Sequence, residues 1–299
     1  MEFMNIFNYL AAEPYAVLFV VGILGLIVGS FLNVVIYRLP IMVKREWRKE
    51  CAELLNVSSV SSPKEDNKEE NEVFNLNQPR SRCPHCKHQI TALENIPILS
   101  FIFLGGKCRH CHENISIRYP VIETLSAILA IITAWHFGFS WALLGALALT
   151  WTLLAASVID FDHQYLFDNI TLPLLWLGLL CNLFGLYTDI TSSVIGAMAG
   201  YLLLWSVYWL FKLFTGKEGM GYGDFKLLAV LGAWMGWQSL AVIIFMSSFV
   251  GAVVGIMLII LRGHDKNIPI PFGPYLAAAG WISFLWGDSI TQTYLQILS

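Results

Sequence analysis

The sequence predicts an all-α polytopic membrane protein of eight transmembrane helices, with a small metal-binding cytoplasmic subdomain between the first and second helices. Three observations carry this prediction: the composition, a series of long charge-free runs, and two C-x-x-C pairs. Of the 299 residues, 57% are hydrophobic and only 13% are charged, whereas average soluble domains carry about 25% charged residues. The chain is therefore too apolar and too sparsely charged for an ordinary soluble protein.

The charge-free runs define the expected helices. They cover residues 14–37, 124–159, 169–188, 190–211, 227–261 and 267–287. One helical crossing needs roughly 20 apolar residues, so the second and fifth runs, of 36 and 35 residues, are each long enough for two. Each has a break suited to a turn, Gly138-Phe139-Ser140 in one and Gly236-Trp237-Gln238-Ser239 in the other. The total is eight crossings.

The basic residues predict the orientation of these helices. Cytoplasmic loops carry an excess of Lys and Arg, and the first helix leads into five basic residues between 38 and 49. Eight alternating crossings then make residues 38–120, 160–168, 212–226 and 262–266 cytoplasmic, and all 18 Lys and Arg residues fall in these loops or at their edges. Both termini are expected outside.

The chain is expected to divide into three parts. Residues 1–40 contain the first transmembrane helix, residues 41–119 form a cytoplasmic loop, and residues 120–299 form a seven-helix membrane domain. Within the loop, residues 41–55 have the pattern of a short amphipathic helix. Residues 56–80 are rich in Ser, Asn and Glu, which is typical of a solvated, flexible linker.

Four cysteines in this loop have the spacing of a structural zinc site. They are Cys83 and Cys86 in one pair and Cys108 and Cys111 in the other, separated by 21 residues. Four thiolates close a tetrahedron around Zn²⁺ and leave no open position for catalysis. Two redox dithiols or two disulfides are alternatives, although disulfides rarely persist in the cytoplasm. Four histidines nearby are alternative ligands: His85, His88, His110 and His112.

Two carboxylates at helix ends are the candidate catalytic groups. Asp224 closes a Gly221-Tyr222-Gly223-Asp224 motif at the start of an apolar segment, and Asp160 lies at the end of another. The helix count places both on the cytoplasmic face. Glycines lack Cβ, which allows a sharp backbone turn and close approach of a peptide. Asp162 and Asp168 rival Asp160 as the first partner, and each acid is also explained as a simple helix-end charge.

A pair of close carboxylates has a definite chemistry. Two such groups do not both ionise easily, so one retains a proton. The ionised carboxylate can then take a proton from water while the protonated one polarises a scissile carbonyl. The alternative is a membrane transporter or sensor, in which the acids bind cations and the zinc loop binds a partner. No nucleic-acid partner is expected in either case.

Several longer blocks of sequence resemble one family, the bacterial type IV prepilin peptidases, also called leader peptidase/N-methyltransferases. The similar blocks, in chain order, are GSFLNVVIYRLP (29–40), the two C-x-x-C pairs, ENIPILS (94–100), ISIRYPVIE (115–123), IDFDHQ (159–164), GMGYGDFK (219–226) and PFGPY (271–275). One departure is visible, because the family usually has Pro-Asp where this chain has Phe167-Asp168.

The resemblance implies a function and assigns residues to it. Asp160 and Asp224 fall on the family's catalytic aspartates, Gly221 and Gly223 on supporting positions, and the four cysteines on its zinc element. The implied substrates are prepilins or pseudopilins, cleaved after a Gly at the inner face of the bacterial inner membrane. The implied second activity is methylation of the new N-terminal residue with S-adenosyl-L-methionine. A peptidase without the methyltransferase activity is a further alternative.

Overall fold

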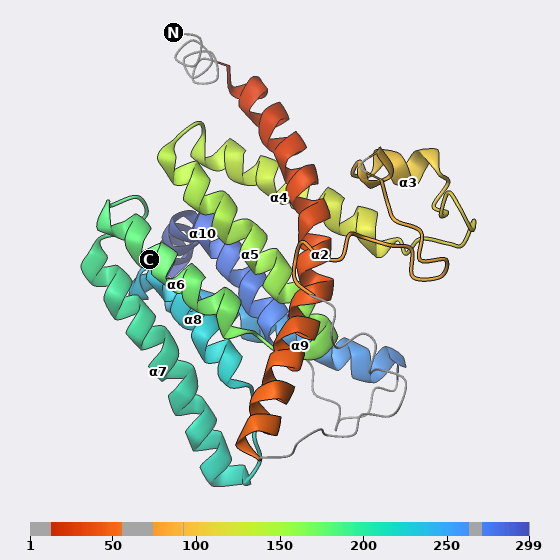
Figure 1. The fold of residues 1–299 in the computed structure, drawn as a ribbon. Coiled ribbons are helices and arrows are strands. Elements are labelled where there is room, and N and C mark those ends of the chain that lie inside the picture. The colour runs from red at the N-terminus through yellow and green to blue at the C-terminus, as the bar shows by residue number, and fades with distance from the viewer. Residues whose placement is uncertain (1–12, 56–73, 92, 263–270, 299) are drawn as a thin grey trace. The chain divides into compact units, whose positions relative to one another are not determined.

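The computed structural model describes residues 13–55, 74–91, 93–262 and 271–298 (Figure 1). The described residues form helices and no strand, with two isolated β-bridges, which confirms the all-α prediction. Most of the predicted linker, residues 56–73, lies outside the described residues. The chain divides into two compact units, one of Met1–Val20 with Leu129–Ser299 and the other of Val21–Ile128.

Eight helices of at least 14 residues occur in the described part of the chain, and they follow the predicted runs. They are α2 (Pro14–Leu54), α4 (Arg118–Phe137), α5 (Trp141–His163), α6 (Asp168–Leu183), α7 (Ile190–Thr215), α8 (Tyr222–Met235), α9 (Leu240–Arg262) and α10 (Gly273–Leu298). Both predicted breaks are present. Gly138 has φ +58° and Gly236 has φ +83°, and the Ser140 side chain accepts the N–H of Leu143 at the start of α5.

Five described helical stretches are long and apolar enough to cross a membrane: Pro14–Leu54, Arg118–Phe137, Trp141–His163, Ile190–Thr215 and Trp237–Leu258. The last combines the short helix η2 (Trp237–Ser239) with most of α9. Two other predicted crossings are short, because α6 has 16 residues and α8 has 14. At 1.5 Å per residue, α8 is about 21 Å long. The eight crossings therefore stay a prediction.

The core of the larger unit is built around α8, which packs against α6, α7 and α10. The side chains of Phe225 and Trp234 on α8 are completely buried. Glycines allow α7 to approach closely, since a Cβ on Gly200 would lie 2.6 Å from the carbonyl oxygen of Leu228. Small residues serve this purpose in packed membrane helices. Protein therefore encloses α8 on most sides, and its first turn carries Asp224 into this enclosed position.

In the smaller unit, α2 continues where two separate helices were expected. The first transmembrane helix and the expected amphipathic helix at 41–55 form a single helix of 41 residues with Pro40 inside it. A proline inside a helix removes one backbone donor, and its ring crowds the carbonyl four residues earlier, yet α2 continues through Pro40. The neighbouring Arg38 is buried, and its guanidinium donates to the carbonyl oxygens of Asn75 and Pro79, at 2.9 and 2.6 Å. These contacts hold the last residues of the predicted linker against α2.

Candidate active site and metal cluster

Asp160 lies in the last turn of α5 and is only 6% exposed. Its Oδ2 accepts a hydrogen bond of 3.1 Å from the backbone N–H of Gly273, the first residue of α10. The absence of a side chain at Gly273 is required for this approach, because a Cβ there would lie 2.5 Å from Oδ2. A carboxylate at a helix N-terminus is also favoured by the helix dipole. The start of α10 thus fixes the position of Asp160.

Asp224 lies in the first turn of α8 and is 7% exposed. Its N–H donates to the carbonyl oxygen of Gly221 at 3.2 Å. The carboxylate of Asp160 lies close enough to interact electrostatically with Asp224, although the two residues are 64 positions apart in sequence. Both are shielded from water, and they come from different helices of the same unit.

The two rival aspartates have different surroundings. Asp162 and Asp168 are exposed, whereas Asp160 is buried. Asp168 forms an ion pair of 2.5 Å with the Nζ of Lys226, which joins the start of α6 to α8. Burial and proximity to Asp224 thus separate Asp160 from the other two. The helix count left this choice open and only the family resemblance favoured Asp160, because burial depends on the packing of helices that are distant in sequence.

The two glycines of the motif matter because their missing side chains leave room for neighbouring atoms, and not because of their backbone dihedral angles. Gly221 has φ −83°, and neither glycine adopts a positive φ, so neither backbone conformation requires a glycine. A Cβ on Gly223 would lie 2.6 Å from the Cβ of Leu166, so this glycine lets the α5–α6 loop pack against α8. At Gly221, a Cβ would meet no atom closer than 3.9 Å, and one of the two atoms at that distance is Oδ2 of Asp224. Gly221 therefore leaves open space beside the carboxylate.

Phe167 occupies the position where a proline was expected from the resemblance. It is the N-cap of α6, with φ −78° and ψ 137°, and proline holds φ at about −65 ± 15°. The Phe167 ring is buried and stacks on Tyr165 with centroids 6.2 Å apart. The backbone thus enters α6 with a proline-like φ, held by aromatic packing.

The four predicted cysteine ligands converge in the smaller unit. Their sulfur atoms all lie within 4.8 Å of one another. The Sγ atoms of Cys83 and Cys111 are 3.8 Å apart, and those of Cys86 and Cys108 are 4.0 Å apart. Metal–sulfur bonds of about 2.3 Å in a tetrahedron place sulfurs roughly 3.8 Å apart. The donor set therefore fits one tetrahedral metal ion, and the histidines considered as alternatives are not part of the cluster.

The cluster is built from two copies of one short turn, a repeat that the sequence analysis missed. In the first copy, the N–H of Cys83 donates to the carbonyl of His88 at 2.9 Å; in the second, Cys108 donates to Glu113 at 2.8 Å. Isolated bridges close both copies, Arg82 with Gln89 and Lys107 with Asn114. Corresponding residues are 25 positions apart. The signal was available in CPHCKH and CRHCHE.

Local electrostatics favour a cation at this cluster. Backbone N–H groups of Cys86 and His85 hold the pKa of the Cys83 thiol at about 6. The N–H of Glu113 lowers the pKa of Cys111, but burial and the neighbouring thiols raise it to about 12. A first thiolate thus forms readily, whereas further negative charge is resisted. A bound divalent cation relieves this repulsion, because metal binding releases the remaining protons.

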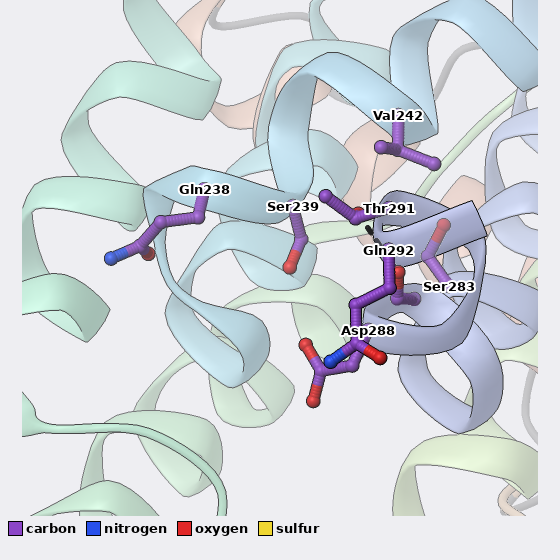
Figure 2. Close-up of a pocket in the computed structure, with 8 residues that line it drawn as sticks. Gln238, Ser239, Val242, Ser283, Asp288, Thr291 and Gln292 are labelled. Atoms are coloured by element: carbon purple, nitrogen blue, oxygen red, sulfur yellow. Dashed lines mark hydrogen bonds between the residues drawn. The ribbon is translucent and has the colours of Figure 1, made fainter. Parts of the chain in front are cut away.

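A separate cavity lies beside η2, which follows the end of α8 opposite Asp224. Figure 2 shows the side chains that line this cavity. It is lined by Gln238 and Ser239 from η2 and by residues of α9 and α10, including Ser283 and Asp288. None of the predicted site residues line it. The aspartate pair is therefore distinct from this cavity.

Two family models match the chain. The bacterial peptidase A24 N-terminal domain matches residues 23–137, and the type IV leader peptidase family matches residues 147–256. The first match includes the cysteine cluster, and the second includes Asp160 and Asp224.

Curated relatives are similar over nearly the whole chain. A protein of Stutzerimonas stutzeri is 55% identical, covering 97% of both chains. One of Aeromonas salmonicida is 56% identical over 95% of this chain and 96% of its own, and one of Legionella pneumophila is 43% identical over 97% of both. Each relative bears the name prepilin leader peptidase/N-methyltransferase. No solved structure matches the chain.

Proposed function

Because the chain belongs to the type IV leader peptidase family, we propose that it is a prepilin leader peptidase and N-methyltransferase of a bacterial inner membrane. It cleaves the cytoplasmic leader of type IV prepilins or pseudopilins after a Gly. It then methylates the new N-terminal residue, often Phe, with S-adenosyl-L-methionine as the methyl donor. The observation that carries the peptidase activity is the buried pair of Asp160 and Asp224.

In the proposed hydrolysis, Asp160 and Asp224 share one proton. The ionised carboxylate takes a proton from water, and the resulting hydroxide attacks the carbonyl carbon of the scissile peptide. The protonated carboxylate donates its proton to the carbonyl oxygen as the tetrahedral intermediate forms. Breaking the C–N bond releases the amine, which receives a proton from the dyad. Because both carboxylates sit in an enclosed site, their interaction with the developing charge is only weakly screened by water.

Residues next to the two aspartates are assigned the role of positioning the carboxylates and admitting the substrate. The N–H of Gly273 holds Oδ2 of Asp160, which leaves its other oxygen for water or the partner carboxylate. The absence of a side chain at Gly221, where an added Cβ would lie 3.9 Å from Oδ2 of Asp224, is assigned to the approach of the substrate backbone. The ion pair of Asp168 with Lys226 ties the start of α6 to the turn that carries Asp224. Gly221 and Gly223 therefore support the site by leaving space.

The proposed topology has eight transmembrane helices, with both termini outside. Three parts are assigned to it: the first helix within residues 1–40, a cytoplasmic loop at 41–119, and a seven-helix peptidase domain at 120–299. The distribution of the 18 Lys and Arg residues supports this orientation. The short α8 fits such a bundle because it is enclosed by protein, where a helix need not reach both membrane surfaces. The dyad then lies at the cytoplasmic end, where a prepilin leader meets its apolar helix.

We assign the cysteine cluster to one structural Zn²⁺, held by Cys83, Cys86, Cys108 and Cys111. Four thiolates leave the metal no open position, so zinc would supply folding energy and no catalytic water. S-adenosyl-L-methionine would supply an electrophilic methyl group to the amine of the mature pilin. We assign no residues of this chain to that cofactor.

Asparagine substitutions test the dyad. Asp160→Asn and Asp224→Asn each retain the shape of the side chain and remove its ability to exchange a proton. Each is expected to abolish cleavage of a purified prepilin in detergent or proteoliposomes, because hydrolysis needs both protonation states. Methylation of a pre-cleaved pilin is expected to continue, as measured by mass spectrometry of its N-terminus.

Asp162→Asn is the matched control, since Asp162 follows Asp160 by two positions and is exposed. It is expected to retain cleavage. Full cleavage by either dyad variant would overturn the assignment of that aspartate. An unmethylated product formed with S-adenosyl-L-methionine present would identify a peptidase that lacks the second activity.

A further inference from the structure

An apolar segment lies between the two cysteine turns, and the metal cluster does not account for it. Residues 95–106, from Asn95 to Gly106, contain no charged side chain. This run of 12 residues is too short to cross a bilayer. Apolar runs of about 10–14 residues are typical of buried core helices or of re-entrant and interfacial segments.

Exposure of the segment excludes a buried core helix. It contains the short helix α3 (Leu99–Phe103), whose Leu99, Ile102 and Phe103 side chains are 52%, 65% and 84% exposed. Their spacing of three and four residues places them on one face of α3. Phe101 points the other way, because a Cβ on Gly106 would lie 3.1 Å from its ring. The segment thus has one face on which Phe101 packs against Gly106 and an outer face of large apolar side chains.

Contacts within the same unit place this segment beside the membrane part of α2 and α4. Helices α2 and α4 approach closely at Gly29, whose added Cβ would lie 2.7 Å from the Cα of Glu123. Gly29 lies nine positions before Arg38, the first charged residue after the apolar run. At 1.5 Å per residue, the two residues are about 13 Å apart along the helix. The backbone N–H of Ile98 donates to Oε2 of this same Glu123 at 2.8 Å. The start of α3 is therefore held beside the apolar part of α2 and not beyond its charged end (Figure 1).

The backbone of the segment is unusual in a way that suits an apolar surrounding. Ile98 has φ +60°, which is rare for a β-branched residue, and the N–H of Leu99 donates to the carbonyl of Pro97 at 2.5 Å. The N–H of Ile98 itself finds the buried carboxylate of Glu123. Backbone donors inside a bilayer have no water to bind and must be satisfied by the protein. Here a strained turn and a buried acid satisfy two of them.

The flanking charges match the cytoplasmic surface of a membrane. Residues 80–118 contain six Lys or Arg and two Glu, which gives a net charge of 6 − 2 = +4. A Zn²⁺ ion together with four thiolates has a net charge of −2, so the net charge of residues 80–118 with the metal bound would be 4 − 2 = +2. Anionic lipids of the cytoplasmic leaflet attract such segments, with about 1 kcal/mol for each basic residue near the surface. Lipid therefore complements both the apolar face and its basic surroundings.

We propose that residues 95–106 dip into the cytoplasmic leaflet, and that lipid acyl chains contact Leu99, Ile102 and Phe103. The side chains of Glu94 and Lys107 mark the two points where the segment leaves the apolar layer. This inference rests on the cytoplasmic placement of the loop proposed above. It adds a second membrane contact to the metal-binding subdomain, beyond the transmembrane helices.

A photo-crosslinking amino acid, p-benzoyl-L-phenylalanine, placed at Phe103 tests the proposal in the full-length protein. The protein is reconstituted in vesicles of phosphatidylethanolamine and phosphatidylglycerol, irradiated, and examined by mass spectrometry. Phe103 is expected to form lipid adducts with a yield comparable to that at Phe31, an exposed position in the apolar part of α2. The same probe at Leu99 provides a second position on the proposed lipid face.

Phe101 is the matched control on the same helix, and the probe there is expected to crosslink to the protein itself. Glu50, which lies in the charged end of α2, is expected to give no lipid adduct. Protein adducts at Phe103, whether to the same chain, a second copy or an added prepilin, would overturn the proposal. So would the absence of any adduct at Phe103 and Leu99 when Phe31 is labelled. The adduct masses are read without an activity assay, so failure here is distinguishable from failure of the proposed dyad.

Discussion

The aspartate site and the cysteine cluster bring distant residues together by opposite means. Asp160 and Asp224 come from two separate helices, and packing around α8 buries both. The four cysteines come from two short turns, and Cys83 is the only buried residue among the described residues between 74 and 117. One site therefore depends on a large apolar core. The other has almost no core and is expected to depend on its proposed metal ion.

This difference predicts different responses to perturbation. Removing the metal is expected to unfold the turns that bind it, because there is little else to hold them. Changing the aspartates is expected to remove chemistry and leave the helix packing intact. Small side chains near the aspartates are expected to be as important as the acids, because they set how closely the helices approach.

Metal removal is expected to have the largest effect. Structural zinc contributes an apparent 10–16 kcal/mol, roughly, to the folding of zinc-finger peptides at neutral pH. Treatment with a strong chelator, or the variant Cys108→Ser, is expected to release one Zn²⁺ per chain and to expose the backbone amides of residues 81–115. Hydrogen exchange followed by mass spectrometry measures this directly. Amides of α5 and α8 are expected to keep their protection.

The control for this experiment is Cys51→Ser. Cys51 is an exposed cysteine on α2 outside the cluster, so its loss is expected to change neither the metal content nor the exchange. Equal loss of protection in α5, α8 and the cysteine turns after chelation would contradict the contrast between the two sites. Retention of metal by Cys108→Ser would contradict the four-cysteine ligand set.

Gly273→Ala is expected to have the next largest effect. The new Cβ would lie 2.5 Å from Oδ2 of Asp160, so the carboxylate or the start of α10 must move. Overpacking of this kind typically destabilises a protein by about 1–3 kcal/mol. Because the displaced group is a proposed catalytic acid, kcat for prepilin cleavage is expected to fall by more than KM rises. Steady-state kinetics and denaturant unfolding measure the two effects.

Gly287→Ala on the same helix is the control, because an added Cβ there would meet no atom closer than the Cβ of Ser283 at 3.9 Å. It is expected to retain both stability and cleavage. If Gly273→Ala were as active as Gly287→Ala, the hydrogen bond from Gly273 would have no part in positioning Asp160.

The two regions also differ in how far the sequence predicted them. The convergence of the four cysteines was predicted correctly because their spacing is local. The breaks at Gly138 and Gly236 were predicted correctly because glycine marks them directly. The hydrogen bond between Gly273 and Asp160 joins residues 113 positions apart, and no local pattern indicates such a contact. The close approach of Gly223 to Leu166 was likewise not predicted, because it depends on how the loop after α5 packs.

Burial of polar residues was the least predictable feature. Asn182 lies in an apolar run and is 2% exposed, yet its amide donates to the carbonyls of Ala233 and Trp234 at 2.8 and 3.0 Å. Its Oδ1 also accepts the N–H of Tyr187 at 3.2 Å. These bonds tie the end of α6 to the end of α8. In the sequence, a single Asn among apolar residues gives no sign that three segments meet there.

The smallest expected effect concerns the ion pair between Asp168 and Lys226. The Nζ and Oδ1 atoms are 2.5 Å apart, but the side chains are 29% and 51% exposed for Lys226 and Asp168. Exposed pairs typically contribute only about 0.2–1 kcal/mol. Asp168→Asn is therefore expected to lower the free energy of unfolding slightly and to leave most of the cleavage activity, in contrast to Asp160→Asn. The difference from the unaltered protein is expected to shrink at high salt, which screens exposed charges.

A double-mutant cycle with Lys226→Met isolates this pair from other effects of either change. The coupling free energy is expected to be below about 1 kcal/mol in low salt. A loss of cleavage by Asp168→Asn as complete as that of Asp160→Asn would show that the exposed acid is part of the reaction. The proposed active site would then include Asp168 at the exposed start of α6 as well as the enclosed start of α8. Burial would no longer distinguish the proposed catalytic aspartates from their neighbours.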